Sequence, residues 1–310
     1  MKILLPIDGS DYSVCAAQFI ASRTSLLGQK PELELFNVQR MRTAIIPELK
    51  KTAEKAEVFG REAEKAFDTV REILKAKGID ATEKMVVGSP AQAIADEVDR
   101  FRPDLLVMGA RGISNFKKLF LGSVTTGVLA RVTVPVLIIR GKHAPKHDSL
   151  KIGLAADGSP YSEAAARYVA ANMKLFGKKP DLRVINVVNV FDKLAYSYPT
   201  EVPLPETAVE EKEAEKNCKE LFAKRPELEK KAFDEALWSI RPIFEKAEIP
   251  VTEVCLAGDA GHEIAKYAKK KLDFLVMGNR GLTNLQSAVM GSVTARVIAD
   301  GKVPLLIVPA

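Results

Sequence analysis

One glycine pattern occurs twice in this chain of 310 residues, and it constrains the fold more than any other feature. Residues 105–126 read LLVMGARGISNFKKLFLGSVTT, and residues 274–295 read FLVMGNRGLTNLQSAVMGSVTA. Each copy has a glycine, two residues, a glycine, nine residues and then Gly-Ser, between an apolar strand-like run and a helix-like run. Two copies of such a long pattern indicate that one domain has been duplicated.

The repeat extends beyond the glycines. KILLPIDGS at residues 2–10 corresponds to KIGLAADGS at 151–159, with an offset of 157 − 8 = 149. At the signature glycines the offset is 278 − 109 = 169, so the second copy has gained about twenty residues between its second and third strands. We predict a first domain at 1–141, a linker at 142–149 and a second domain at 150–310 with an insertion at about 191–247.

Strand-like and helix-like segments alternate within each copy. The strand-like runs are almost continuously apolar, which is typical of a parallel sheet covered by helices on both faces. The alternation therefore predicts an α/β protein made of two tandem doubly wound parallel-sheet domains. In the first copy we expect strands near 2–7, 32–39, 81–87, 104–109 and 135–140, and helices near 11–28 (with Gly28 as C-cap), 48–77, 90–101 and 123–131.

The predicted insertion has two parts. Residues 191–206 contain three prolines and are expected to form a loop, whereas residues 207–247 have the pattern of a charged helical segment interrupted near Pro226 and Pro242. We expect its tyrosines and Trp238 to pack this segment on its domain, and a contact surface is the alternative.

The glycine signature has the residue types of a phosphate-binding loop. Backbone N–H groups at a helix N-terminus bind anions, and glycine allows the close approach that this requires. Ser123 and Ser292 are expected to cap their helices and to offer a hydroxyl to a phosphate. Asp8 and Asp157 end the first strand of each copy, where a carboxylate either binds a ribose or caps the following helix.

Both halves resemble the universal stress protein family. The resemblance rests on DGS after the first strand, on the glycine signature, and on the final strands VPVLII and VPLLIV. It implies Rossmann-like, adenine nucleotide α-hydrolase-like domains that bind ATP or another adenine nucleotide, with Mg²⁺ where hydrolysis occurs. It also implies a cytoplasmic stress-response protein whose two domains pair through their last strands, 135–140 and 304–308.

The resemblance further implies one nucleotide site in each half. Two departures from the first copy affect the second site: Ala155-Ala156 replaces Pro6-Ile7, and the insertion lies near the ligand side. The candidate residues of the first half are Asp8, Val38, Met108, Gly109, Arg111, Gly112, Gly122, Ser123 and Val124. Those of the second half are Asp157, Val187, Met277, Gly278, Arg280, Gly281, Gly291, Ser292 and Val293.

Catalysis has weak support in the sequence. There is no GxxxxGK[ST] loop, and no Ser-His-Asp or Cys-His set can be assembled, so we expect at most weak ATP hydrolysis. An interaction scaffold with one or both nucleotide sites unused is the alternative function, and a true nucleotide-converting enzyme ranks last.

Composition limits the classes of partner that this chain is expected to bind. The net charge of +6 is spread along the chain without a basic aromatic face, so nucleic acid is not an expected partner. The apolar runs are too short to span a bilayer, and His143 and His147 have no third strong ligand, so neither a membrane partner nor a metal site is expected. The apolar N-terminus is expected to be the first strand rather than a signal peptide. Three cysteines without a CxxC indicate a reducing compartment, and His143 and His147 are expected to be exposed in the linker. The sequence leaves open whether two chains associate as a homodimer.

Overall fold

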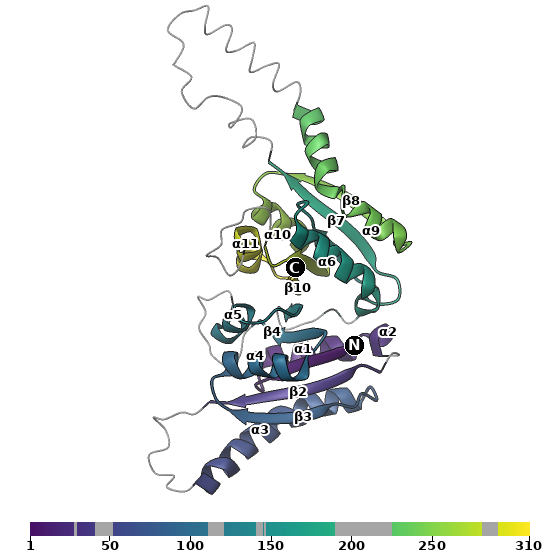
Figure 1. Ribbon diagram of the computed structural model, residues 1–310. Coiled ribbons are helices and arrows are strands. Elements are labelled where there is room, and N and C mark those ends of the chain that lie inside the picture. The colour runs from purple at the N-terminus through teal and green to yellow at the C-terminus, as the bar shows by residue number, and fades with distance from the viewer. Residues whose placement is uncertain are drawn as a thin grey trace, which may run out of the picture.

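The computed structural model describes residues 1–27, 30–40, 52–110, 121–140, 145, 147–189, 225–280 and 291–310. Of the predicted site residues, Arg111, Gly112 and Gly281 lie outside these ranges, as does the larger part of the predicted insertion, 190–224. Strands and helices alternate through both halves (Figure 1).

In the first half, the elements match the expected order. The strands are β1 (Lys2–Ile7), β2 (Glu32–Gln39), β3 (Thr82–Val87), β4 (Leu105–Gly109) and β5 (Val136–Ile139). The helices are α1 (Asp11–Ala21), α2 (Thr24–Leu27), α3 (Thr52–Lys75), α4 (Pro90–Phe101) and α5 (Ser123–Leu129).

The second half repeats this order. Its strands are β6 (Lys151–Ala155), β7 (Asp181–Val188), β8 (Val251–Ala257), β9 (Phe274–Gly278) and β10 (Leu305–Val308). Its helical elements are α6 (Pro160–Ala171), the 3-10 turn η1 (Met173–Phe176), a helix over residues 225–237, α9 (Arg241–Lys246), α10 (Ala260–Lys271) and α11 (Ser292–Asp300).

All ten strands form one sheet in the order β3-β2-β1-β4-β5-β10-β9-β6-β7-β8. Strands within each half are parallel, and β5 pairs with β10 in antiparallel register, with Leu137 opposite Leu306. The predicted doubly wound fold and the predicted pairing of the last strands are both confirmed. The pairing leaves β3 and β8 as the outer strands of an elongated molecule (Figure 1).

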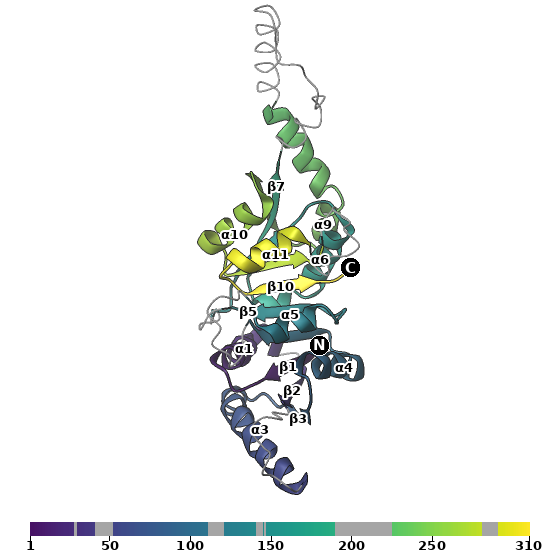
Figure 2. The ribbon, with the colours of Figure 1, turned by 90° about the vertical axis from the view of Figure 1, so that its left-hand side faces the viewer.

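Helices cover both faces of the sheet (Figure 2), and the apolar core continues from one half into the other. One core cluster packs α1, α3, α6 and α9 on the sheet, and the other packs α4, α5, α10 and α11. Phe274 of β9 stacks on Phe19 of α1 with ring centroids 5.8 Å apart, and Phe176 meets its edge at 5.1 Å. Each of the two core clusters therefore contains residues of both halves.

The helix over 225–237 and α9 occupy, in the second half, the place of α3 in the first. Arg71 of α3 pairs with Glu64 and Glu83, and Arg241, at an offset of 241 − 71 = 170, pairs with Asp234 and Glu253 at the same offset. Residues 225–246 thus belong to the domain itself, and the prediction of an insertion reaching 247 extends too far toward its carboxyl end.

The predicted helix 11–28 is interrupted at Ser22 and Arg23, between the end of α1 at Ala21 and the start of α2 at Thr24. The Ser22 hydroxyl donates to the Phe19 carbonyl at 2.7 Å, and the chain turns so that the Arg23 side chain becomes fully buried. The Arg23 guanidinium donates to the carbonyls of Pro145 and His147 at 3.0 and 2.7 Å, which fixes part of the linker on the first domain. Gly28, the predicted C-cap, lies outside the described residues.

Candidate functional site

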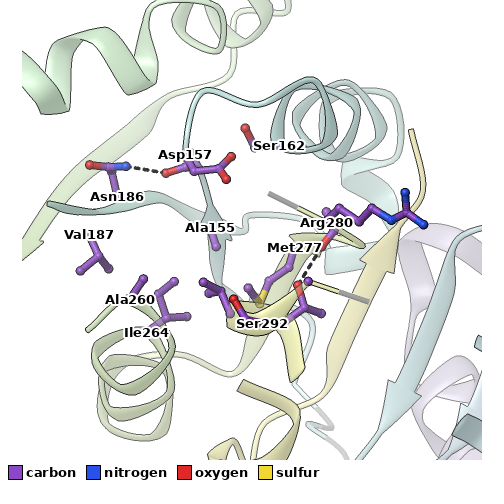
Figure 3. Close-up of a pocket in the computed structure, with 15 residues that line it drawn as sticks. Ala155, Asp157, Ser162, Asn186, Val187, Ala260, Ile264, Met277, Arg280 and Ser292 are labelled. Atoms are coloured by element: carbon purple, nitrogen blue, oxygen red, sulfur yellow. Dashed lines mark hydrogen bonds between the residues drawn. The ribbon is translucent and has the colours of Figure 1, made fainter. Parts of the chain in front are cut away.

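A cavity of about 250 Å³ lies at the carboxyl ends of β6, β7 and β9, beside the N-termini of α10 and α11 (Figure 3). Open parallel sheets bind ligands at this edge. Every predicted second-half site residue within the described ranges lines this cavity: Asp157, Val187, Met277, Gly278, Arg280, Gly291, Ser292 and Val293.

Asp157 supports the turn that leads from β6 into α6. Its Oδ1 accepts hydrogen bonds from the Ser159 backbone N–H at 3.1 Å and from the Ser159 hydroxyl at 2.6 Å. The Ser159 Oγ in turn accepts from the Ser162 N–H at 3.2 Å, so Ser159 is the N-cap of α6. Asp157 therefore holds the capping residue in place while it lines the cavity.

Gly278 is required by packing at the end of β9. A Cβ at this position would lie 2.8 Å from the backbone carbon of Tyr161, at the start of α6. In the first half, a Cβ on Gly109 would lie 2.9 Å from the backbone carbon of Tyr12. The first glycine of each signature thus lets a strand approach a helix closely, whatever ligand lies beside it.

The last Gly-Ser of the signature opens α11 toward the cavity. Gly291 is the N-cap, with φ −63° and ψ 150°, and Ser292 is the first helical residue. No side chain caps this helix, so the predicted capping role of Ser292 is wrong, and Ser123 likewise follows the N-cap Gly122. The N–H groups of a first helical turn have no partner within the helix and attract anions.

Arg280 adds a cation beside this helix end. Its Nε is buried without a hydrogen-bond partner among the described residues. In Figure 3 its guanidinium points away from Asn186 and Val187. The guanidinium is therefore not directed at the β7 side of the cavity.

Asn186 is a lining residue that the sequence analysis missed. It is 6% exposed, and its Nδ2 donates to the Ala156 carbonyl at 2.7 Å (Figure 3). Because a carbonyl only accepts, this bond fixes the amide orientation and leaves Oδ1 as the acceptor. The repeat carried a signal, since Asn37 makes the same bond to the Ile7 carbonyl at 2.8 Å. Ala155 and Ala156, which the sequence marked only as a replacement of Pro6-Ile7, also line the cavity, and the other missed lining residues are Ser162, Ala260, Ile264 and Thr294.

The first half repeats the geometry of the second around Asp8. The Asp8 Oδ1 accepts from the Ser10 N–H at 3.1 Å, and Gly122 begins α5 with φ −68° and ψ 150°. The Thr125 hydroxyl donates to the Gly109 carbonyl at 3.1 Å, as Thr294 does to Gly278. Val38, Met108, Ser123 and Val124 lie at the positions matched to the second-half lining residues.

Catalytic and metal-binding groups are sparse in the part of the chain that the structure describes. Within it, no group of three or more His, Cys, Asp or Glu side chains could hold a metal ion. His147 lies 3.6 Å from Asp273, remote from the cavity lining, and the His262 N–H donates to Asp259, the N-cap of α10. No helix among the described residues is long and apolar enough to cross a membrane.

Comparisons with known proteins agree on one family. The model of the universal stress protein family matches residues 1–140 and 149–309. The universal stress protein YxiE of Bacillus subtilis is 32% identical over 147 residues, which are 45% of this chain and 98% of that protein.

Two solved structures are also similar. A universal stress protein from Archaeoglobus fulgidus has 21% identity and a TM-score of 0.66, over 99% of this chain and 98% of its own. A universal stress protein solved in complex with cAMP has 27% identity over 45% of this chain and 96% of its own, with a TM-score of 0.34. The first supports the whole two-domain fold.

Proposed function

The chain belongs to the universal stress protein family as two copies of its domain in tandem, and from this premise we propose that it is an adenine-nucleotide-binding, stress-response regulatory protein. One site lies in each half, and ATP, ADP or AMP is the ligand class. The observation that carries the proposal is the second-half cavity, which has Asp157 at one end and the uncapped N-terminus of α11 at the other.

The cavity fits such a ligand because its two ends differ in chemistry. The apolar walls formed by Ala155, Val187 and Met277 suit the faces of a nucleobase. The first turn of α11, with Gly291 and Ser292, suits the phosphates. The nucleoside therefore lies toward β6 and β7, and the phosphates lie toward α11.

The first half supports a second site through its matching backbone. Asp8, Gly122 and the Thr125 bond reproduce the second-half geometry, and Ile7 fills the place of Ala156 with a larger side chain. We propose that both sites bind the same ligand class and that they differ in affinity.

Binding, rather than turnover, is the proposed activity. Neither end of the cavity carries a histidine or cysteine, and its lining carboxylate, Asp157, already holds Ser159. Hydrolysis with Mg²⁺ is at most a slow side activity. The domain boundaries that we propose remain 1–141 and 150–310, joined by a linker at 142–149.

The first test is to denature the purified protein and identify the released small molecules by mass spectrometry. Titration calorimetry with ATP, ADP, AMP and cAMP then measures affinity, since a similar protein binds cAMP. Two equivalents of adenine nucleotide per chain support two sites, and one equivalent supports one working half. A flat titration of the folded protein with every ligand would overturn the proposal in favour of a scaffold.

Two glycine variants assign the sites. The backbone angles of Gly122 and Gly291 suit any residue, so valine there should leave the helices intact while its side chain blocks the phosphates. Gly291→Val and Gly122→Val should each weaken one site about tenfold or more. Gly60→Val is the matched control. Gly60 lies on α3, outside both proposed sites, and a Cβ added there meets no atom within 4 Å.

A further inference from the structure

The helix over 225–237 has a second apolar face directed away from the core. Its inner face is occupied, since Leu237 is fully buried and Phe233 packs against the core. On its outer side Trp238 is 80% exposed and Leu228 is 37% exposed. An exposed tryptophan of this kind is typical of an interaction site rather than of a solvated surface.

Four exposed residues share this outer side. Leu228, Lys231, Glu235 and Trp238 follow one another at spacings of three, four and three residues. This spacing places the first three on one side of the helix, and Trp238 extends that side in the turn directly after the helix. We call these four residues the outer stripe. A shallow hollow lies beside it, lined in part by Lys231, Glu235 and Trp238.

The outer stripe is complementary to itself in antiparallel orientation. When the outer sides of two such helices pack about a two-fold axis at the level of residue 233, Leu228 of one copy meets Trp238 of the other. Lys231 then meets Glu235. Among the described residues, neither the Lys231 side chain nor the Glu235 side chain makes an ion pair or hydrogen bond with another residue. An apolar pair and an opposite-charge pair therefore form twice each.

The first half provides an internal comparison for this pattern. At an offset of 238 − 68 = 170, the outer stripe corresponds to Val58, Arg61, Lys65 and Asp68 of α3. The same antiparallel pairing of α3 would oppose Arg61 with Lys65, which is repulsive. Asp68 is also engaged within its own chain, since it pairs with Arg71 at 2.6 Å. Self-complementarity is thus a property of the second half alone.

We propose that two copies of this chain associate through the outer stripe, as a two-fold symmetric pair of antiparallel helices. The contact lies at the β8 end of the elongated molecule (Figure 1), away from the β5–β10 pairing that joins the two halves. The association is independent of nucleotide binding, because no residue of the outer stripe lines the cavity beside α11.

Trp238 is the only tryptophan of the chain, so its fluorescence reports directly on the contact. A single pair of short helices is a small interface, and we expect a dimer that dissociates on dilution from about 200 µM. On dilution the emission of Trp238 should shift to the red as the mass measured by sedimentation velocity falls from two chains to one. The mass of one chain at every concentration would overturn the proposal.

Substitution of the tryptophan tests the apolar pair. Trp238→Asp introduces the residue that the first half has at the matched position and should weaken association at least about tenfold. Val87→Asp is the control, since Val87 is an exposed apolar residue of β3 outside the outer stripe, 41% exposed. Unchanged association of Trp238→Asp would contradict the proposal.

Charge exchange distinguishes a second copy from a segment of the same chain. Lys231→Glu and Glu235→Lys each place like charges opposite one another in a homodimer and should yield single chains. An equimolar mixture of the two variants restores both opposite-charge pairs between chains, so the mass should return to that of a dimer. If the mixture stays monomeric while each variant is folded, the outer stripe does not bind a second copy.

Discussion

Around the first strand of each half the hydrogen bonds repeat closely, whereas the side chains outside that region differ. The amide of Asn37 donates to the Ile7 carbonyl at 2.8 Å, and that of Asn186 donates to the Ala156 carbonyl at 2.7 Å. The Thr125 and Thr294 hydroxyls both donate at 3.1 Å to the glycine that ends the fourth strand. These bonds join side chains to the backbone, so a substitution would disturb the chain path itself.

One clear difference lies in a cluster of side chains on β2 and α4, although the ion pairs of Arg71 repeat at Arg241. In the first half, the buried Glu34 and Glu97 both bind Arg100. The matched residues of the second half, Arg183 and Tyr267, instead form a hydrogen bond of 3.0 Å. The duplicated domain therefore retains the backbone geometry around its cavity in both halves, whereas some of its packing contacts and its outer surface differ.

The largest effect should come from filling the close contact between strand and helix. Gly109→Ala and Gly278→Ala should each lower the free energy of unfolding by about 3 kcal/mol, because the new Cβ meets the backbone of Tyr12 or Tyr161. Denaturation in urea measures both. Gly60→Ala, with no atom within 4 Å of its Cβ, should instead be neutral or stabilising. Tolerance of alanine at only one of the two sites would break the equivalence of the halves.

The next largest effect on stability should come from a contact between the halves that has no counterpart in the opposite direction. Arg140, after β5, is buried, and its guanidinium donates to the carbonyls of Val297, at 3.1 Å, and Ile298 at the end of α11. Arg140→Ala should lower the free energy of unfolding by about 2 kcal/mol and speed amide exchange in α11. The exposed Arg131, which lies after α5 and donates to the Gly127 carbonyl of that helix at 2.6 Å, is the control. An equal loss on Arg131→Ala would argue that Arg140 has no special role.

Sequence reasoning predicted the order of elements, the sheet and many residues that line the second-half cavity, because these depend on local periodicity and on a repeated signature. It placed Trp238 in a packing contact because aromatic residues are usually buried. A helix, however, has only one core face, and here Leu237 and Phe233 occupy it. The error could not be detected without knowing that residues 225–246 replace α3.

The site shows the same limit in two further residues. The capping role predicted for Ser292 fails because Gly291 already takes the N-cap position, a shift of one residue that sequence patterns do not resolve. Asn186 was missed because its importance depends on a neighbouring strand, where the Ala156 carbonyl fixes its amide. Contacts between strands are not visible in the sequence of either one.

A smaller effect should separate the two nucleotide sites. Ala156 lines the second-half cavity, and its counterpart Ile7 is buried with 3% exposure. Ala156→Ile adds volume to a cavity of about 250 Å³ and should weaken nucleotide binding in that half about tenfold, as measured by calorimetry. Ala76→Ile, at an exposed position after α3, is the control. Unchanged affinity of Ala156→Ile would remove the cavity as the basis for a difference between the sites.

The smallest effect, and the most informative on pH, concerns the carboxylate pair found only in the first half. Burial raises the pKa of Glu34, and the neighbouring Glu97 raises it further. Burial also acts to raise the pKa of Glu97, but hydrogen bonds from Arg100 and Lys84 outweigh it and lower that pKa. The two groups therefore contribute to stability with opposite signs.

A raised pKa in the folded state means that ionised Glu34 destabilises the fold at neutral pH, and the penalty disappears as the pH falls and this carboxyl is protonated. Glu34→Gln should therefore raise the free energy of unfolding by about 1 kcal/mol at pH 7, and the gain should shrink in acid. Glu97→Gln should do the reverse: its loss is greatest at neutral pH and fades as the pH falls through the lowered pKa of Glu97. Urea denaturation from about pH 4 to 8 measures both variants. If the free energies of unfolding of the two variants changed with pH in parallel, Glu34 and Glu97 would titrate as one unit. The opposite contributions of the two carboxyls to stability would then be contradicted.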